Sequence, residues 1–199
     1  MYSLVAVLSR PVLNGLYRLR AEGVEDLPAE GGYVLACNHV SSFDPWPIGM
    51  PLYPRRQLRF MAKSELYWWP LTYVLNGAGA FPVRRGQNDT EAIETAVELV
   101  RAGEIVAMFP EGTRRTKGLV KKFEARPRSG AARIALEAGA PLVPAAVKGT
   151  DGLMRFRRLH VAYGRPVDID DLRGHDAATA AQEATVRLMQ RIDELEEAL

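Results

Sequence analysis

His39 and Asp44 are the residues of this chain whose types and spacing point most directly to chemistry. Imidazole is the side chain whose unperturbed pKa lies nearest neutrality, so a histidine can accept a proton at physiological pH. A carboxylate five residues further on can hold one ring nitrogen and stabilise the imidazolium that forms. The pair predicts general-base catalysis on a hydroxyl supplied by a substrate. The alternatives are a structural histidine and an aspartate that caps a helix beginning at Pro45, and the capping and catalytic roles of Asp44 are compatible.

The pair directly follows a predicted buried strand. An apolar run over residues 32–37, between glycines and a polar loop, is typical of such a strand. Strands alternating with helices predict an α/β fold, a layered sandwich with a largely parallel central sheet flanked by helices. The further strands are expected over 105–109, 142–147 and 159–163, and the helices over 88–103, 129–139 and from about 178 to the last residue.

Size and composition indicate an ordinary globular protein. The 199 residues predict a single domain over 1–199, in which 1–20 is a candidate interfacial helix and 176–199 a C-terminal helix. One cysteine, Cys37, excludes an intramolecular disulfide. Because the three histidines and this cysteine show no spacing typical of metal ligands, no metal is predicted.

Positive charge is concentrated in a few segments although the net charge is only +2. Basic residues gather over 55–59, at 84–85 and over 114–133. Such groups indicate an anionic partner, namely phosphate, nucleic acid or a lipid headgroup, and the alternative is a solvated basic surface. The longest run lacks the interleaved aromatic residues that stack on bases, so no nucleic-acid partner is expected.

Two apolar segments could contact a membrane. The N-terminal run is shorter than the roughly 20 residues that a spanning helix needs, and without a basic segment ahead of it no signal peptide is expected. Residues 1–20 therefore predict either a helix lying on an anionic membrane surface or a helix packed on the core. Residues 67–71 include two tryptophans, which suit a membrane interface or a core anchor.

Four short motifs lie at or near the ends of the expected strands, where open α/β sheets carry their sites. They are Asn38-His39 through Asp44, Gly79 through Arg85, Phe109 through Arg114, and Val143 through Val147. In this order and spacing, over roughly residues 20 to 150, the chain resembles the glycerolipid acyltransferase family, best represented by bacterial 1-acyl-sn-glycerol-3-phosphate acyltransferases.

The resemblance implies an O-acyltransferase that makes phosphatidic acid. The acyl chain would pass from acyl-CoA or acyl-carrier protein, as co-substrate, to the free hydroxyl of a lysophospholipid, first of all 1-acylglycerol-3-phosphate. His39 would remove the hydroxyl proton and Asp44 would fix the imidazole tautomer, without an acyl-enzyme. No other cofactor is implied. The enzyme would be peripheral or monotopic, at the cytoplasmic face of the membrane, and would contact an anionic membrane surface.

The resemblance also implies the substrate-binding residues. Arg114, Arg85 and Lys63 would hold the phosphate, since a guanidinium makes paired, charge-assisted hydrogen bonds. Glu111, Gly112 and Thr113 belong to the third motif. Gly112 would allow the backbone to approach a ligand closely, and the backbone N–H groups of this turn could stabilise the developing oxyanion. Glu111 would orient Arg114, the glycerol of the substrate or the loop itself. The segment 121–130 is longer and more basic than is usual in the family.

Other functions remain open at this level. The enzyme could acylate another lysolipid or a different acceptor, or hydrolyse the thioester with water. A non-catalytic lipid-binding protein of the same fold is a further alternative. A thiol nucleophile at Cys37 is a weaker one, based on its position two residues before His39 on the same strand face.

Overall fold

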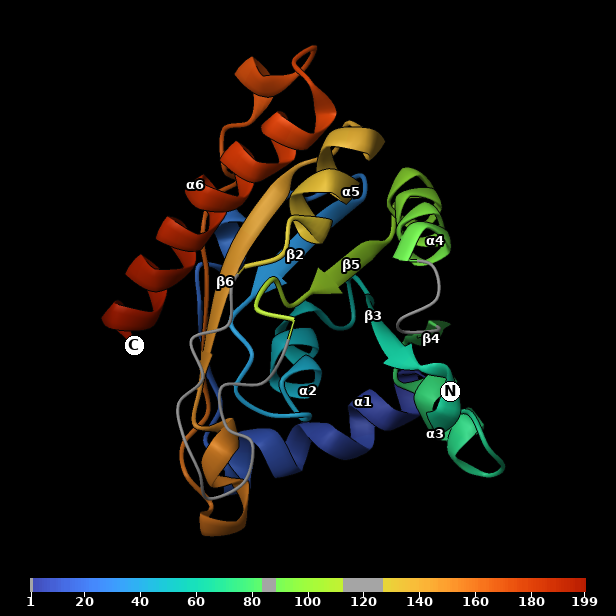
Figure 1. The fold of residues 1–199 in the computed structure, drawn as a ribbon. Helices are drawn as coiled ribbons and strands as arrows, with labels where there is room; N and C mark the ends of the chain where they lie inside the picture. Colours follow the sequence, from blue (N-terminus) through green and yellow to red (C-terminus); the bar gives the residue numbers. More distant parts are fainter. Residues whose placement is uncertain (1, 84–88, 113–126) are drawn as a thin grey trace, which may run out of the picture.

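The computed structural model describes residues 2–83, 89–112 and 127–199. Within these ranges a seven-stranded sheet forms the centre, in the order β1-β7-β6-β2-β5-β3-β4 (Figure 1). Strands β2 to β6 are parallel, whereas β7 pairs antiparallel with β6 and β1 pairs parallel with β7. The prediction of a largely parallel sheet is therefore confirmed. The strands are β1 Arg20–Glu22, β2 Tyr33–Cys37, β3 Leu58–Lys63, β4 Ala80–Val83, β5 Ile105–Met108, β6 Leu142–Lys148 and β7 His160–Tyr163.

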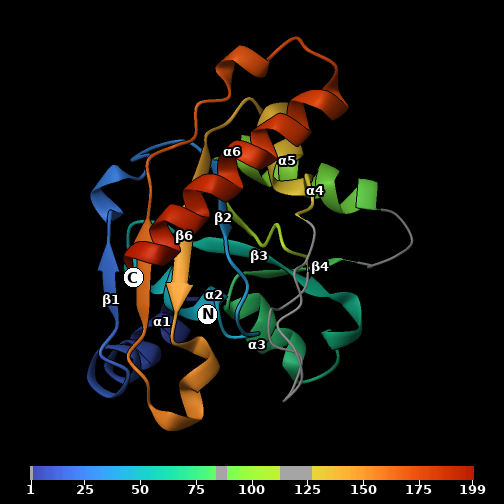
Figure 2. The same cartoon turned by 60° about the vertical axis from the view of Figure 1, so that its left-hand side comes forward.

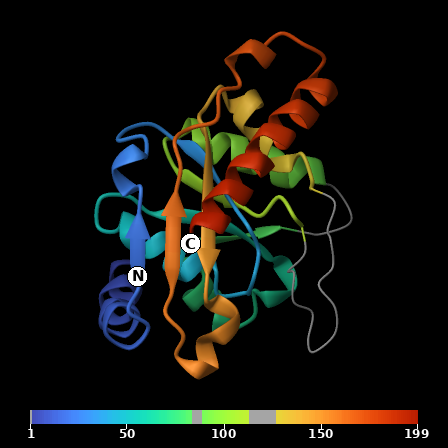
Figure 3. The same cartoon turned by 90° about the vertical axis from the view of Figure 1, so that its left-hand side faces the viewer.

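Helices cover both faces of the sheet. Helices α4, α5 and α6 pack on one face, while α2 and the short turns η2 and η3 pack on the other (Figure 3). Figure 2 shows α6 crossing in front of β6, with which it makes extensive contact. The helices are α1 Tyr2–Pro11, α2 Pro45–Gly49, α3 Leu71–Gly77, α4 Asp89–Arg101, α5 Gly130–Ala138 and α6 Ala177–Ala198. The short helical turns are η1 Val12–Leu16, η2 Val24–Asp26, η3 Met50–Leu52, η4 Ser64–Leu66, η5 Thr150–Arg155 and η6 Asp170–Leu172.

The all-apolar sequence of β2 follows from this burial on two faces. Alternate residues of a strand point to opposite faces, so Val34 and Ala36 join the core beneath α4, α5 and α6. Tyr33, Leu35 and Cys37 join the core on the α2 side. Because neither face reaches water, the strand shows no polar alternation.

The parallel strands bring the sequence motifs to one edge of the sheet. The carboxyl ends of β2, β3, β4, β5 and β6 all lie at this edge, since the five strands share one direction. The loop with His39 follows β2, and the Phe109 motif follows β5. Lys63 is the last residue of β3. The site therefore forms where open parallel sheets carry their ligands.

The two candidate membrane segments are exposed at the same end of the molecule. Helix α1 packs on the core through Ala6, while Leu4 and Leu8 are 61% and 65% exposed, so its contact with a membrane surface stays a prediction. Trp68 and Trp69 are 58% and 77% exposed, so the alternative that they anchor the core is wrong. Within the described residues, no helix has the length and apolar character needed to cross a bilayer.

Candidate active site

His39 and Asp44 meet in one loop between β2 and α2. Nδ1 of His39 lies 2.8 Å from Oδ2 of Asp44, and the carboxylate is fully buried. A carboxylate can only accept a hydrogen bond here, so Nδ1 carries a proton, and in the neutral imidazole Nε2 is then left with a lone pair. This is the geometry of a general base held by its carboxylate partner.

Asp44 accepts further hydrogen bonds instead of capping α2. The backbone N–H groups of Val40 and Ser41 donate to Oδ2 at 2.8 and 2.9 Å, and the hydroxyl of Thr150 donates to Oδ1 at 2.6 Å. Helix α2 begins at Pro45 as expected, but no side-chain bond caps it. The capping role predicted for Asp44 is therefore wrong, because its oxygens turn back to the preceding loop.

Asn38 fastens the same loop to the neighbouring strand β6. Its buried side chain donates to the carbonyl of Val147 at 3.1 Å and accepts from the N–H of Val147 at 2.8 Å. The amide thus satisfies both backbone groups of one residue at the point where β2 has ended. This pairing fixes the residue that precedes His39.

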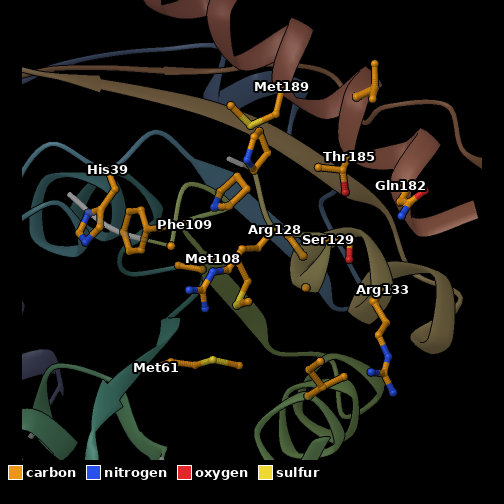
Figure 4. Close-up of a pocket in the computed structure, with 18 of the residues that line it drawn as sticks. His39, Met61, Met108, Phe109, Arg128, Ser129, Arg133, Gln182, Thr185 and Met189 are labelled. Carbon is orange, nitrogen blue, oxygen red and sulfur yellow. The ribbon is translucent and has the colours of Figure 1, made fainter. Parts of the chain in front are cut away.

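Phe109 packs against one face of the His39 ring. Its ring stacks on the imidazole of His39, with centroids 4.2 Å apart and planes inclined by 22° (Figure 4). The His39 side chain remains 17% exposed. With Nδ1 on Asp44 and one face on Phe109, Nε2 is the ring atom available to a substrate hydroxyl.

A long groove of about 1740 Å³ begins at His39 and runs along the face covered by α4, α5 and α6. Its apolar wall comes from β3, β4, β5 and α4, including Met61, Val83, Ile93 and Met108. Met189 of α6 lines the opposite side (Figure 4). The apolar wall lies on the sheet and α4 side of the groove, whereas α6 also contributes polar and acidic side chains, namely Gln182, Gln190, Asp193, Glu194 and Glu197.

Three cationic side chains also line this groove. Lys63 stands at the end of β3, Arg128 lies two residues before α5, and Arg133 lies in the first turn of that helix. Arg133 pairs with Glu137, its neighbour one helical turn away. Lys63 was expected from the sequence, whereas Arg128 was noted only as part of the basic run 114–133. No pattern in the sequence singles Arg128 out, because the turn that brings it back to the third motif depends on the fold.

Gly112 lies against the Arg128 guanidinium group. The glycine has φ +66°, and a Cβ there would be 2.8 Å from Nε of Arg128. The backbone N–H of Arg128 donates to the carbonyl of Pro110 at 2.7 Å, which fixes its approach. The positive φ therefore favours glycine here, whereas the flexible Arg128 side chain could move away from a Cβ.

The remaining predicted residues have different outcomes. Glu111 is buried directly before Gly112. Arg85, Thr113 and Arg114 lie outside the described residues, so their roles stay predictions. The suggestion that N–H groups of this turn stabilise an oxyanion is wrong for Gly112, because its N–H donates to the carbonyl of Phe109 at 2.9 Å.

Cys37 does not reach the groove. Its side chain is buried in the core on the α2 side, and the thiol donates to Oδ1 of Asn38 at 3.2 Å. Burial raises the pKa of this thiol well above its usual value, and the negative charges of Asp44 and Glu111 raise it further. The thiol is therefore protonated at neutral pH, which argues against a nucleophile at this position.

Comparisons with known proteins identify the family of this chain. The family model described as Acyltransferase matches residues 18–148. The chain is 33% identical over 204 residues to 1-acyl-sn-glycerol-3-phosphate acyltransferase of Bacillus subtilis, covering 100% of this chain and 98% of that protein. It is 28% identical over 151 residues to the protein of the same name from Streptococcus pneumoniae, covering 71% of this chain and 52% of that relative, so the chain spans about half its length.

A solved structure shares the fold. The crystal structure of the 1-acyl-sn-glycerophosphate acyltransferase PlsC from Thermotoga maritima superposes with a TM-score of 0.70 at 21% identity. The match covers 98% of this chain and 79% of that one. The family model and the full-length similarity to the B. subtilis protein thus define an acyltransferase. This chain belongs to the Acyltransferase family, and the prediction of an O-acyltransferase is confirmed at the level of that family.

Proposed function

We propose that this enzyme transfers an acyl chain from acyl-CoA or acyl-carrier protein to the free hydroxyl of a lysophospholipid. The preferred acceptor is 1-acylglycerol-3-phosphate, and the product is phosphatidic acid. The observation that carries the proposal is the His39–Asp44 pair, with a 2.8 Å bond, at the end of a groove with apolar walls and cationic side chains. The names of the relatives from B. subtilis and S. pneumoniae support the choice of acceptor.

The reaction follows from the orientation of the imidazole. Nε2 of His39 accepts the proton of the acceptor hydroxyl while Nδ1–H stays on Asp44. The oxygen attacks the thioester carbonyl, the new ester C–O bond forms and the C–S bond breaks. The imidazolium then returns its proton to the departing thiolate. Such acid–base assistance is worth about 10²–10⁴ in rate.

Cationic side chains of the groove would hold the phosphate of the acceptor. Lys63 and Arg128 line the groove that begins at His39 (Figure 4 labels Arg128). A guanidinium makes short, paired hydrogen bonds to phosphate oxygens, which fixes the position of the glycerol hydroxyl relative to the base. Arg85 and Arg114 are the further candidates from the sequence.

An apolar edge would bring the active site to the membrane that contains the acceptor. We define this edge by its exposed side chains, Leu4, Leu8, Phe43, Trp68, Trp69, Met154 and Phe156. Phe43 lies in the catalytic loop itself, and Figure 1 shows α1, α3 and η5 together at the lower end of the molecule. Exposed arginines on the same segments, including Arg10, Arg18 and Arg155, favour an anionic surface and a peripheral association.

The proposal is tested by supplying the purified chain with vesicles, lysophosphatidic acid and either thioester donor, and following phosphatidic acid by mass spectrometry. We expect product with at least one donor, and a higher kcat/KM than with lysophosphatidylcholine. Arg128→Ala should raise KM for lysophosphatidic acid about tenfold, since a charge-assisted contact is lost. Arg165→Ala, which removes an exposed arginine paired with Asp26 elsewhere, is the matched control.

Two results would contradict the proposal. Release of free fatty acid without an acceptor would indicate a hydrolase. Binding of lysolipid without consumption of either thioester would indicate a lipid-binding protein.

A further inference from the structure

Thr150 reaches the catalytic loop from a distant part of the chain. It is the first residue of η5, two residues after the end of β6, and its side chain is buried, at 2% exposure. Its hydroxyl lies 2.6 Å from Oδ1 of Asp44, across a separation of 106 residues.

The hydrogen bonds of Asp44 divide unequally between its two oxygens. Oδ2 accepts from Nδ1 of His39 and from the N–H groups of Val40 and Ser41. All three donors belong to the loop that precedes Asp44. Among the described contacts, Oδ1 accepts only from Thr150. The three bonds to Oδ2 and the Thr150 bond to Oδ1 together oppose rotation of the carboxylate about its Cβ–Cγ bond, and the Thr150 bond is the one that ties it to a separate part of the fold.

We propose that Thr150 is a positioning residue, which acts through Asp44 to hold the imidazole of His39 in its reactive orientation and tautomer. This inference rests on the proposed function, since it explains how the general base is maintained. Thr150 does not contact the reacting atoms. Loss of its hydroxyl therefore lowers the rate of the chemical step and leaves substrate binding unchanged.

The part of the fold that carries Thr150 is suited to this task. Strand β6 lies beside β2 in the interior of the sheet, and Val147 near its end is already bonded to Asn38. Between strand and threonine, Gly149 has φ +96°, and a Cβ there would lie 2.1 Å from the carbonyl oxygen of Arg158. The hydroxyl is thus presented by a turn that has little room to shift.

A purely structural role is the competing explanation. Thr150 could merely satisfy a buried carboxylate, because leaving such a group unpaired lowers stability. Both explanations predict a lower unfolding temperature when the hydroxyl is removed. They differ in kcat, in the ring tautomer, and in the dependence of the effect on Asp44.

The experiment compares Thr150→Val, which keeps the branched shape, with Thr150→Ser, which keeps the hydroxyl. We expect Thr150→Val to lower kcat about tenfold with both KM values within about twofold, the lower part of the range for a bond to a charged group. Thr150→Ser should restore kcat to within about threefold. The matched control is Thr95→Val, which removes a hydroxyl bonded to the carbonyl of Glu91 within α4.

A double-mutant cycle tests whether the effect passes through Asp44. In an Asp44→Asn background, Thr150→Val should change the residual kcat by less than about twofold, because the charge that it orients is already absent. An undiminished tenfold effect in that background, or a wild-type kcat for Thr150→Val, would overturn the inference.

A measurement independent of turnover separates this inference from the proposed function. Long-range ¹H–¹⁵N NMR correlations report which nitrogen of His39 is protonated. We expect Nδ1–H in the wild type and Thr150→Ser, and a mixture of tautomers in Thr150→Val. If the wild type acylates no lysolipid, this result still decides whether Thr150 orients the pair. An unchanged single tautomer in Thr150→Val would refute it.

Discussion

At the scale of single residues, Asp44 holds the imidazole ring of His39 in one orientation through the bond to Nδ1. Three loop donors and one distant hydroxyl surround a carboxylate that has no exposure. A buried charge is tolerated only when it is hydrogen-bonded in this way. The consequence is an imidazole with one nitrogen committed and the other available, which is what proton abstraction requires.

Asp44→Asn tests this dependence. The amide oxygen can still accept from the loop N–H groups, while the amide N–H₂ can donate to the Thr150 hydroxyl, so the chain should fold. We expect kcat to fall at least about 100-fold, because the charge facing the imidazolium is lost. Steady-state rates and thermal unfolding measure the two effects. Full activity in a folded Asp44→Asn protein would show that the carboxylate has no catalytic role.

Cys37 offers a second test at this scale. Because burial raises its thiol pKa, the folded protein holds the proton to higher pH than the unfolded chain, and this stabilising difference is lost as pH rises through the folded pKa. At pH 8 we expect alkylation by iodoacetamide to be at least about 100-fold slower in the native state than in urea. Cys37→Ala should keep its kcat. Rapid alkylation of Cys37 in the native protein, together with loss of activity, would support the hypothesis that its thiol is a nucleophile.

At the scale of elements, the turn after β6 links the sheet to the catalytic loop. Gly149 and Gly174 both have positive φ, at +96° and +91°. A Cβ at Gly149 would meet the Arg158 carbonyl, whereas a Cβ at Gly174 would meet nothing within 4 Å. A substitution at Gly174 therefore tests backbone strain alone, whereas a substitution at Gly149 tests backbone strain together with a steric clash.

Gly149→Ala and Gly174→Ala form a matched pair. We expect Gly174→Ala to lower the free energy of unfolding by about 1 kcal/mol, the usual cost of placing a Cβ at positive φ. Gly149→Ala should cost about 3–4 kcal/mol and also lower kcat, since the turn carrying Thr150 must move. Urea unfolding and initial rates provide the comparison. Equal losses in both variants would mean that the close approach to Arg158 has no consequence.

The sequence predicted the strands that are buried on both faces better than the strands that carry exposed or charged residues. The apolar runs of β2, β5 and β6 identify them because both faces of these strands are buried. Strands β1, β3 and β4 were not predicted as such. All three residues of β1 are exposed, β3 contains Arg59 and Lys63, and β4 contains Pro82, which an edge strand tolerates.

The candidate site shows the same limit. His39 and Asp44 could be paired from the sequence because they are close in the chain and one turn joins them. Thr150 and Arg128 could not, since their contacts with Asp44 and Gly112 depend on strand order and on the approach of separate loops. Spacing in sequence carries no information about such contacts.

At the scale of the whole molecule, one end combines the catalytic loop with exposed apolar side chains. Trp68 and Trp69 are the largest of them, and tryptophan favours the membrane–water interface. We expect the double substitution Trp68→Ser and Trp69→Ser to weaken binding to anionic vesicles at least about tenfold, given the apolar area removed. Added salt should weaken binding further by screening the arginines.

Vesicle flotation measures this binding directly. Val186→Ser, which removes an exposed apolar side chain of α6, is the control for binding alone. Unchanged flotation of the double variant would show that the apolar edge does not contact the membrane.

The central claim is that His39 removes the proton from the acceptor hydroxyl. The most direct measurement is the initial rate of labelled acyl transfer from a thioester to lysophosphatidic acid, compared between wild type and His39→Gln at equal concentrations of folded protein. We predict a rate at least about 10³-fold lower in the variant, with an unchanged unfolding temperature within a few degrees. A variant rate within tenfold of the wild-type rate would contradict the assignment of His39 as the general base.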